Sequence, residues 1–130
     1  MIKYGAYWMA RGAVYHQYVG LCLDEKSFQR NLKSLKIPHP WPAWVSETAN
    51  ATTHHMSRPD GEHLTIVCLR EKPGESPISV ASILVHEAVH IWQFFCDSIG
   101  ETKPSEEFEA YTIQNISYRL FEAYVKMKKL

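Results

Sequence analysis

The sequence predicts an α+β domain from two features. Residues 63–70 (HLTIVCLR) are rich in branched apolar side chains and follow the turn signal Asp60-Gly61, and a second extended stretch at 51–56 (ATTHHM) precedes that turn. Two extended arms around an Asp-Gly pair are typical of a β-hairpin. The C-terminal half carries two long helical patterns instead. We therefore expect a small antiparallel hairpin or sheet followed by two helices, in one domain over residues 1–130.

The elements around this hairpin are predicted from helix and strand signals. Residues 24–36 carry apolar side chains at helical spacing, with Asp24 suited to cap the helix and Pro38 to end it. Residues 14–21 are expected to add a third strand. The strand at 63–70 is expected either at an edge, where it can pair with an extended peptide, or in the interior of the sheet.

The two C-terminal helices have clear predicted ends. Ser76 is suited to cap the first helix, with Pro77 at its first position, and this helix is expected to run to Ser98, just before Gly100. The second helix is expected over residues 105–127. Its apolar positions at helical spacing are Ile113, Ile116, Leu120, Tyr124 and Met127.

Composition argues against several classes of partner. Lys plus Arg and Asp plus Glu number 14 each, so the formal net charge is zero and gives no general attraction to nucleic acid or to an acidic membrane. The three cysteines are far apart and odd in number, which favours reduced thiols over a disulfide framework. No apolar stretch reaches the ~20 residues of a membrane span, and no leader pattern is present. We expect a cytoplasmic protein with no nucleic-acid or membrane partner.

One motif suggests a specific chemistry: His86-Glu87-Ala88-Val89-His90, inside the first C-terminal helix. Helical residues four apart project from the same face, with Cβ atoms about 5–6 Å apart. Two imidazoles at that spacing can reach one zinc ion at about 2.0–2.1 Å. Glu87 lies one position further round the helix and is suited to contact a water molecule beside the ion. This pattern is typical of zinc hydrolases in which the glutamate acts as general base.

The same five residues also fit a metal-free core helix with two buried, hydrogen-bonded histidines. The flanking residues, SILV before and IWQFF after the motif, are apolar and predict that the helix is largely buried. Buried histidine and glutamate side chains cost free energy unless they have partners. A shared metal ion is such a partner, so we favour the metal site.

A third ligand is expected from the last helix, because a catalytic zinc ion usually has three protein ligands and one open position. Glu106, Glu107 and Glu109 lie at its start, and the 17 residues from His90 to Glu107 allow a helix end, a turn and an antiparallel helix. Glu109 shares the face of the apolar stripe, and Glu107 shares a polar and aromatic face with Tyr111. If the stripe faces the histidine helix, Glu109 or Glu106 becomes the ligand. If the stripe faces the core and the other face borders the cleft, Glu107 does.

The two motifs together resemble the gluzincin metallopeptidases, which include thermolysin-like peptidases and small single-domain and phage-encoded relatives. The resemblance rests on residues 86–90 and on Glu107-Phe108-Glu109-Ala110-Tyr111, and it covers about residues 77–125. It implies a zincin-like domain in which zinc is held by His86, His90 and Glu107. Tyr111 departs from the family pattern, since many relatives have an aspartate there that orients a histidine ligand.

These observations predict a zinc-dependent peptidase that hydrolyses peptide bonds, with Glu87 as general base and a peptide or protein as substrate. The first alternative is a non-catalytic metal-binding phage or prophage protein with a regulatory or structural role. An intact Glu87 argues against it, because a structural site needs no base. The second alternative is a metal-free binding module.

Weaker candidates lie outside the motif. His54 and His55 are expected either as a surface pair, which we favour, or as an oxyanion stabiliser or a partner of a metal ligand. Tyr111 and Tyr118 can donate to a developing oxyanion, although tyrosines on a half-buried helix more often simply pack.

Overall fold

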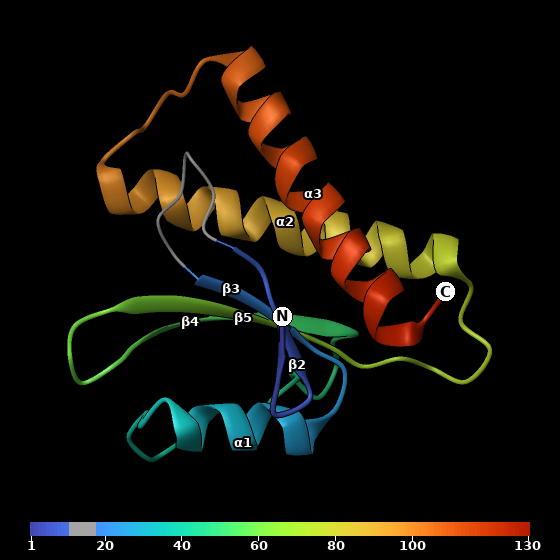
Figure 1. Cartoon of the computed structure of the whole chain (residues 1–130). Coiled ribbons are helices and arrows are strands. Elements are labelled where there is room, and N and C mark those ends of the chain that lie inside the picture. The colour runs from blue at the N-terminus through green and yellow to red at the C-terminus, as the bar shows by residue number, and fades with distance from the viewer. Residues whose placement is uncertain (11–17) are drawn as a thin grey trace. The chain divides into compact units, whose positions relative to one another are not determined.

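The computed structural model describes residues 1–10 and 18–130, which divide into two compact units, Met1–Gly74 and Glu75–Leu130. Within the described residues, the N-terminal unit contains five strands and one helix, and the C-terminal unit contains two helices (Figure 1). The predicted α+β class is therefore confirmed. The single domain predicted over residues 1–130 stays a prediction.

The N-terminal unit is built on one mixed sheet. Its strands are β1 (Ile2–Lys3), β2 (Ala6–Trp8), β3 (Tyr18–Cys22), β4 (Ala51–Ser57) and β5 (His63–Leu69). In the described part of the chain they lie in the order β1-β2-β3-β5-β4. β3 pairs parallel with β5, and the other neighbours pair antiparallel. The expected all-antiparallel sheet is wrong in this pairing, because β3 and β5 are joined by a long connection that holds a helix and β4.

β4 and β5 flank the Asp60-Gly61 turn and pair in a register that sets His54 opposite Ile66. Gly61 has a φ of 88°, a conformation that glycine adopts without strain. β5 lies between β3 and β4, so residues 63–69 form an interior strand and not the peptide-pairing edge that was one of the two expectations. The expected third strand begins, in its described part, with β3 at Tyr18, and residues 14–17 lie outside the described residues.

Helix α1 (Glu25–Ser34) covers one face of this sheet (Figure 1). Asp24 caps it as predicted, with its carboxylate accepting a backbone N–H of the first turn at 2.8 Å. The helix ends two residues before the predicted position 36, because Lys36 adopts a left-handed conformation with a φ of 59°. Phe28 and Leu32 are buried in the core of the unit. The other buried members of this core cluster are Ala6, Cys22, Val45, Leu64, Ile66 and Cys68.

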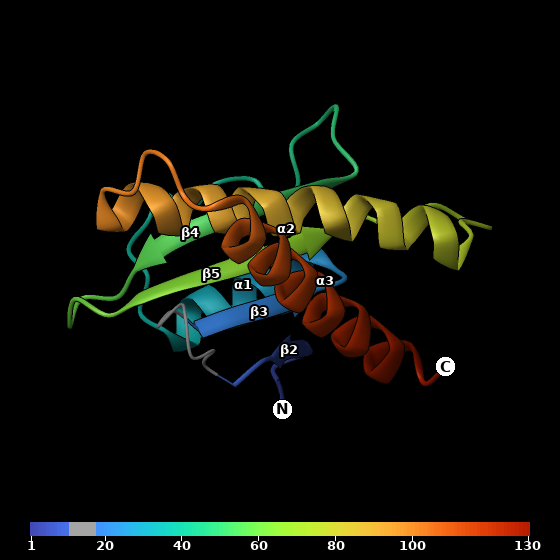
Figure 2. The same ribbon diagram turned by 90° about the horizontal axis from the view of Figure 1, so that it is seen from above.

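The C-terminal unit consists of α2 (Pro77–Ile99) and α3 (Glu106–Lys128), which cross one another (Figure 2). Ser76 caps α2 as predicted, and its Oγ accepts the Ser79 N–H at 3.1 Å. Gly100 ends α2 in the left-handed conformation, with a φ of 71°. Both helices begin and end within one residue of their predicted bounds. The caps of α2 are local signals, whereas Ser105 at the start of α3 makes no side-chain cap hydrogen bond.

Trp92 of α2 contacts the first turn of α3. Its side chain is 2% exposed, and its ring centroid lies 5.4 Å from that of Phe108 in the first turn of α3. The indole Nε1 donates a hydrogen bond to the Glu109 carboxylate at 2.8 Å. Of the predicted apolar stripe on α3, Ile116, Leu120 and Tyr124 are buried, and Ile113 and Met127 are half-buried.

Candidate metal centre

α2 presents His86 and His90 together on an exposed face. Because the two residues are one helical turn apart, their rings lie side by side, with centroids 4.8 Å apart and planes at 74°. The two Nε2 atoms are 3.1 Å from each other. The helix therefore brings two imidazole nitrogens together at one point, as the spacing predicted.

This separation fits a shared zinc ion. Two ligands at about 2.0–2.1 Å from a tetrahedral zinc ion are about 3.3–3.4 Å apart. The observed 3.1 Å differs from that by a few tenths of an ångström, which small ring rotations supply. The same distance also suits a hydrogen bond in which one neutral ring donates its N–H to the other. Zinc binding needs both nitrogens deprotonated, so the two states exclude one another.

Glu87 adds a carboxylate on the buried side of the histidine pair. It is 4% exposed, and its Oε2 lies 3.9 Å from His86 Nε2. Within the described residues, one candidate ligand atom from each of His86, Glu87 and His90 falls in a group whose members all lie within 4.8 Å of one another. The donor set of two imidazoles and a nearby carboxylate fits the ligand preferences of zinc.

The exposure of the histidines corrects one expectation from the sequence. The apolar flanks predicted a largely buried helix, but the His86 side chain is 69% exposed and His90 is also exposed. Several apolar residues of α2 face outward as well, among them Ile78 at 83% and Val85 at 40% exposed. Of the three motif residues, Glu87 alone is buried, so the cost of burying polar groups applies to the carboxylate and not to the imidazoles.

The three glutamates of the first turn of α3 differ in their surroundings. Glu106 and Glu107 are exposed, and Glu109 is half-buried against Trp92 of α2. Burial and the Glu109 carboxylate together raise the pKa of the Cys96 thiol, which also belongs to α2. Glu109 is thus the glutamate that faces α2, and the group formed by His86, Glu87 and His90 does not include Glu107. No sequence pattern indicated the hydrogen bond between Glu109 and Trp92.

The weaker candidates take other roles. His54 is 8% exposed, and its Nε2 donates to the Trp44 carbonyl at 2.8 Å, so the expectation of a surface pair is wrong for this residue. His55, on the opposite face of β4, has its Nδ1 2.9 Å from Thr65 Oγ1. Tyr111 and Tyr118 are 67% and 62% exposed, so they are not packed as expected of a half-buried helix.

Comparison with protein-family models, with curated proteins and with solved structures gives no match. The likeness to gluzincin peptidases therefore rests on the two motifs of α2 and α3 alone.

Among the described residues, α2 alone is long and apolar enough to cross a membrane by length and composition. The core helix of a soluble protein passes the same test, so this is weak evidence for a membrane. A span would also place His86, Glu87 and His90 in hydrocarbon, where a charged group costs about 2.5–3.5 kcal/mol at the helix centre.

Proposed function

We propose that this protein is a zinc-dependent peptidase in which His86 and His90 bind the ion through their Nε2 atoms. The convergence of these two atoms to 3.1 Å on an exposed helix face is the observation that supports the proposal most directly. The buried carboxylate of Glu87 beside them completes the pattern expected of a hydrolytic site. A purely structural zinc site has four closed protein ligands and no need of such a carboxylate.

The third ligand in this proposal is a carboxylate from the first turn of α3. The gluzincin resemblance implies Glu107, which is exposed and has a side chain that can move. Glu109 is the alternative, because its contact with Trp92 places it against α2. One Glu109 oxygen already accepts from the indole, and Trp92 is on a different face of α2 from His90 because the two are only two residues apart. These two points favour Glu107.

In the proposed hydrolysis, the zinc ion and Glu87 have different roles. A zinc ion held by His86 and His90 would supply Lewis acidity, which lowers the pKa of water to about 7 and polarises a peptide carbonyl. Glu87 accepts a proton from the water that attacks the carbonyl carbon. The carbon–nitrogen bond then breaks, and Glu87 delivers the proton to the leaving amine.

Exposure of the histidine pair is consistent with a macromolecular substrate. With the His86 side chain 69% exposed, a peptide can approach it from solvent. We propose peptide or protein substrates in the cytoplasm, with no nucleic-acid or membrane partner, as the balanced charge suggests.

The competing function is metal binding without catalysis, as in a regulatory or structural phage protein. The separation of Glu107 from the group of His86, Glu87 and His90 favours this alternative, because two histidines alone hold zinc weakly. The buried Glu87 favours catalysis.

Zinc content and peptide cleavage together test the proposal. Protein stripped with chelator is expected to take up one zinc ion per chain and then to cleave fluorescein-labelled denatured casein. Glu87→Gln is expected to keep the zinc and to lower the cleavage rate by at least about 100-fold, the usual contribution of a general base. Glu122→Gln, an exposed glutamate of α3, serves as the matched control and keeps full activity.

The outcomes separate the three functions. Stoichiometric zinc with equal cleavage in wild type and Glu87→Gln supports the non-catalytic metal protein. No zinc uptake in the wild type supports a metal-free module and ends the peptidase proposal.

A further inference from the structure

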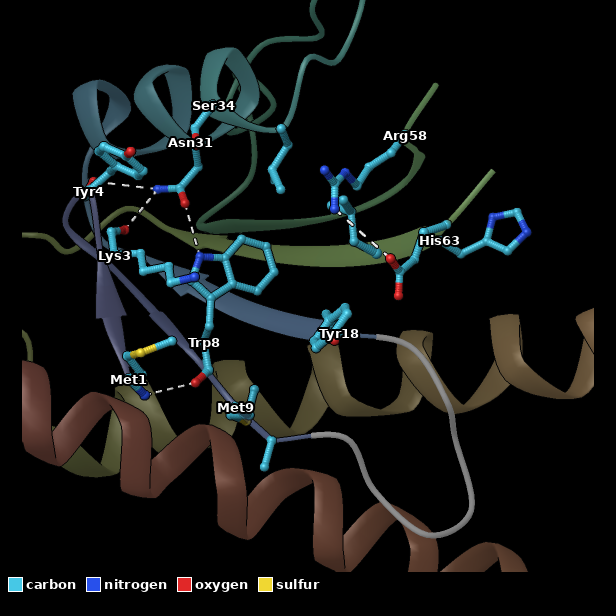
Figure 3. Close-up of a pocket in the computed structure, with 14 residues that line it drawn as sticks. Met1, Lys3, Tyr4, Trp8, Met9, Tyr18, Asn31, Ser34, Arg58 and His63 are labelled. Atoms are coloured by element: carbon cyan, nitrogen blue, oxygen red, sulfur yellow. Dashed lines mark hydrogen bonds and ion pairs between the residues drawn. The ribbon is translucent and has the colours of Figure 1, made fainter. Parts of the chain in front are cut away.

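A cavity of about 760 Å³ lies within the N-terminal unit, between β2, α1 and the β4–β5 turn (Figure 3). Trp8, Tyr4 and Tyr18 give it aromatic walls, and Lys3 and Arg58 bring positive charge. Its volume is in the range of sites for small organic ligands, about 300–1,000 Å³. None of its lining residues belongs to the histidine site, so a ligand bound in this cavity would be independent of the proposed peptidase activity.

The indole of Trp8 is fixed in place as one wall. Its Nε1 donates to Asn31 Oδ1 at 2.9 Å, and Asn31 Nδ2 donates in turn to the Ser27 carbonyl at 2.8 Å. One ring face lies flat on Gly20 of β3, where an added Cβ would come within 2.9 Å of three ring atoms. The other face is left to line the cavity. A flat, rigid aromatic surface of this kind suits stacking with a planar ring.

Arg58 faces Trp8 across the same space (Figure 3). Its Nη1 lies 3.9 Å from carboxylate oxygens of Asp60 and Glu62, beyond hydrogen-bond distance. Its Nε is buried and has no hydrogen-bond partner in the described part of the chain. A buried donor without a partner costs free energy, so the Nε of this guanidinium is in an unfavourable position.

A carboxylate in the cavity would satisfy Arg58. Rotation about the terminal bonds of the side chain breaks the two long ion pairs with Asp60 and Glu62 and turns the edge formed by Nε and Nη2 toward the cavity. That edge donates two parallel hydrogen bonds to one carboxylate. Lys3 and Arg58 outnumber Glu62 among the charged side chains that line the cavity, which favours an anion, and the aromatic walls match a planar ring.

We propose that this cavity binds a small aromatic carboxylate, with the ring stacked on Trp8 and the carboxylate paired with Arg58. The probe is 2-naphthoate, and its neutral counterpart is 2-naphthalenemethanol. Binding is followed through the Trp8 indole N–H resonance in ¹H–¹⁵N spectra, assigned with Trp8→Phe. We expect a Kd for 2-naphthoate of about 1 mM or tighter, and binding of the alcohol at least about tenfold weaker, because it lacks the charge-assisted pair.

The matched variants are Arg58→Gln and Arg30→Gln. Arg58→Gln is expected to weaken 2-naphthoate binding at least about tenfold and to leave binding of the alcohol unchanged. Arg30 is exposed on α1 and does not line the cavity, so its substitution leaves both ligands unaffected. If Arg58→Gln fails to fold, the acid-to-alcohol ratio in wild-type protein and its loss at high salt still test the pairing.

Three results would overturn this assignment. The first is no shift of the Trp8 resonance up to 10 mM 2-naphthoate, about ten times the expected Kd. The second is equal binding of the acid and the alcohol, which would leave Arg58 as a purely structural partner of Asp60 and Glu62. The third is an equal response to inorganic phosphate, which would indicate an unspecific anion site.

Discussion

Glu107 and Glu109 form a matched pair that can separate a metal ligand from a structural carboxylate. Glu109 accepts from Trp92 Nε1 at 2.8 Å, and Trp92 is 2% exposed, whereas Glu107 is exposed. Glu109→Ala leaves the indole N–H buried without an acceptor, which costs about 1–3 kcal/mol. Either substitution also removes a charge that favours the helix N-terminus, worth about 0.3–1 kcal/mol in both variants. We expect Glu109→Ala to lower the free energy of unfolding by about 1–3 kcal/mol more than Glu107→Ala.

Urea unfolding of metal-free protein, followed by far-ultraviolet circular dichroism, measures this difference. The comparison holds when the two variants unfold with the same m value. In a Trp92→Phe background the indole donor is gone, so Glu109→Ala is expected to lose only the charge effect that it shares with Glu107→Ala. Equal losses for the two variants in the wild-type background would refute an energetic role for the bond between Trp92 and Glu109.

For zinc affinity we expect the opposite order, with Glu107 more important than Glu109. Glu107→Gln is expected to weaken zinc binding by more than about 100-fold, because loss of an indirect partner of a ligand alone costs about 10–100-fold. Glu109→Gln keeps an acceptor for Trp92 and is expected to weaken zinc binding by less than about tenfold. Competition with a chelating dye measures both. If Glu109→Gln has the larger effect, the ligand is Glu109 and the residue match to the gluzincins is wrong at Glu107.

Three further predictions concern the zinc ligands, the packing of Trp8 and the Cys96 thiol. His86→Ala is expected to abolish stoichiometric zinc uptake, measured by atomic absorption, whereas His63→Ala, at the first residue of β5, leaves it intact. Gly20→Ala is expected to lower the free energy of unfolding by about 1–3 kcal/mol, because its Cβ would lie 2.9 Å from ring atoms of Trp8; an unchanged urea midpoint would contradict the close packing. Burial raises the pKa of Cys96, so the neutral thiol dominates and iodoacetamide at pH 8 is expected to label the native protein far more slowly than urea-unfolded protein.

The parts of the fold that depend on local signals could be predicted from the sequence. Ser76, Pro77 and Gly100 set the ends of α2, and Asp24 sets the start of α1. Asp24, Ser76 and Gly100 satisfy backbone groups within one turn, and Pro77 has no N–H that needs an acceptor. The parallel pairing of β3 with β5 could not be predicted from the sequence. The paired residues are more than 40 positions apart, and no local sequence pattern determines which distant strands pair. β1 and β2 were also missed, since strands of two and three residues carry almost no periodic signal.

In the candidate site, too, local features could be predicted from the sequence and features that depend on long-range contacts could not. The spacing of His86 and His90 predicts their convergence, because it depends only on the helical repeat. Which glutamate of α3 faces α2 depends on how the two helices cross, and sequence periodicity leaves that open. The Arg58 cavity was missed altogether. Its walls come from four separate segments of the chain. The Nε of Arg58 has no hydrogen-bond partner among the described residues, and no sequence pattern indicates this.

The exposure of the histidines changes which metal-free explanation competes with zinc. A core helix with buried, hydrogen-bonded imidazoles would account for the motif by packing alone, but His86 and His90 are exposed and lie against each other. Two exposed imidazoles gain little from their mutual contact, because water solvates each of them equally well. The remaining metal-free explanation is an incidental surface pair. It predicts that His86→Ala leaves both folding and ion binding unchanged, and one zinc titration of that variant against wild type decides between the two.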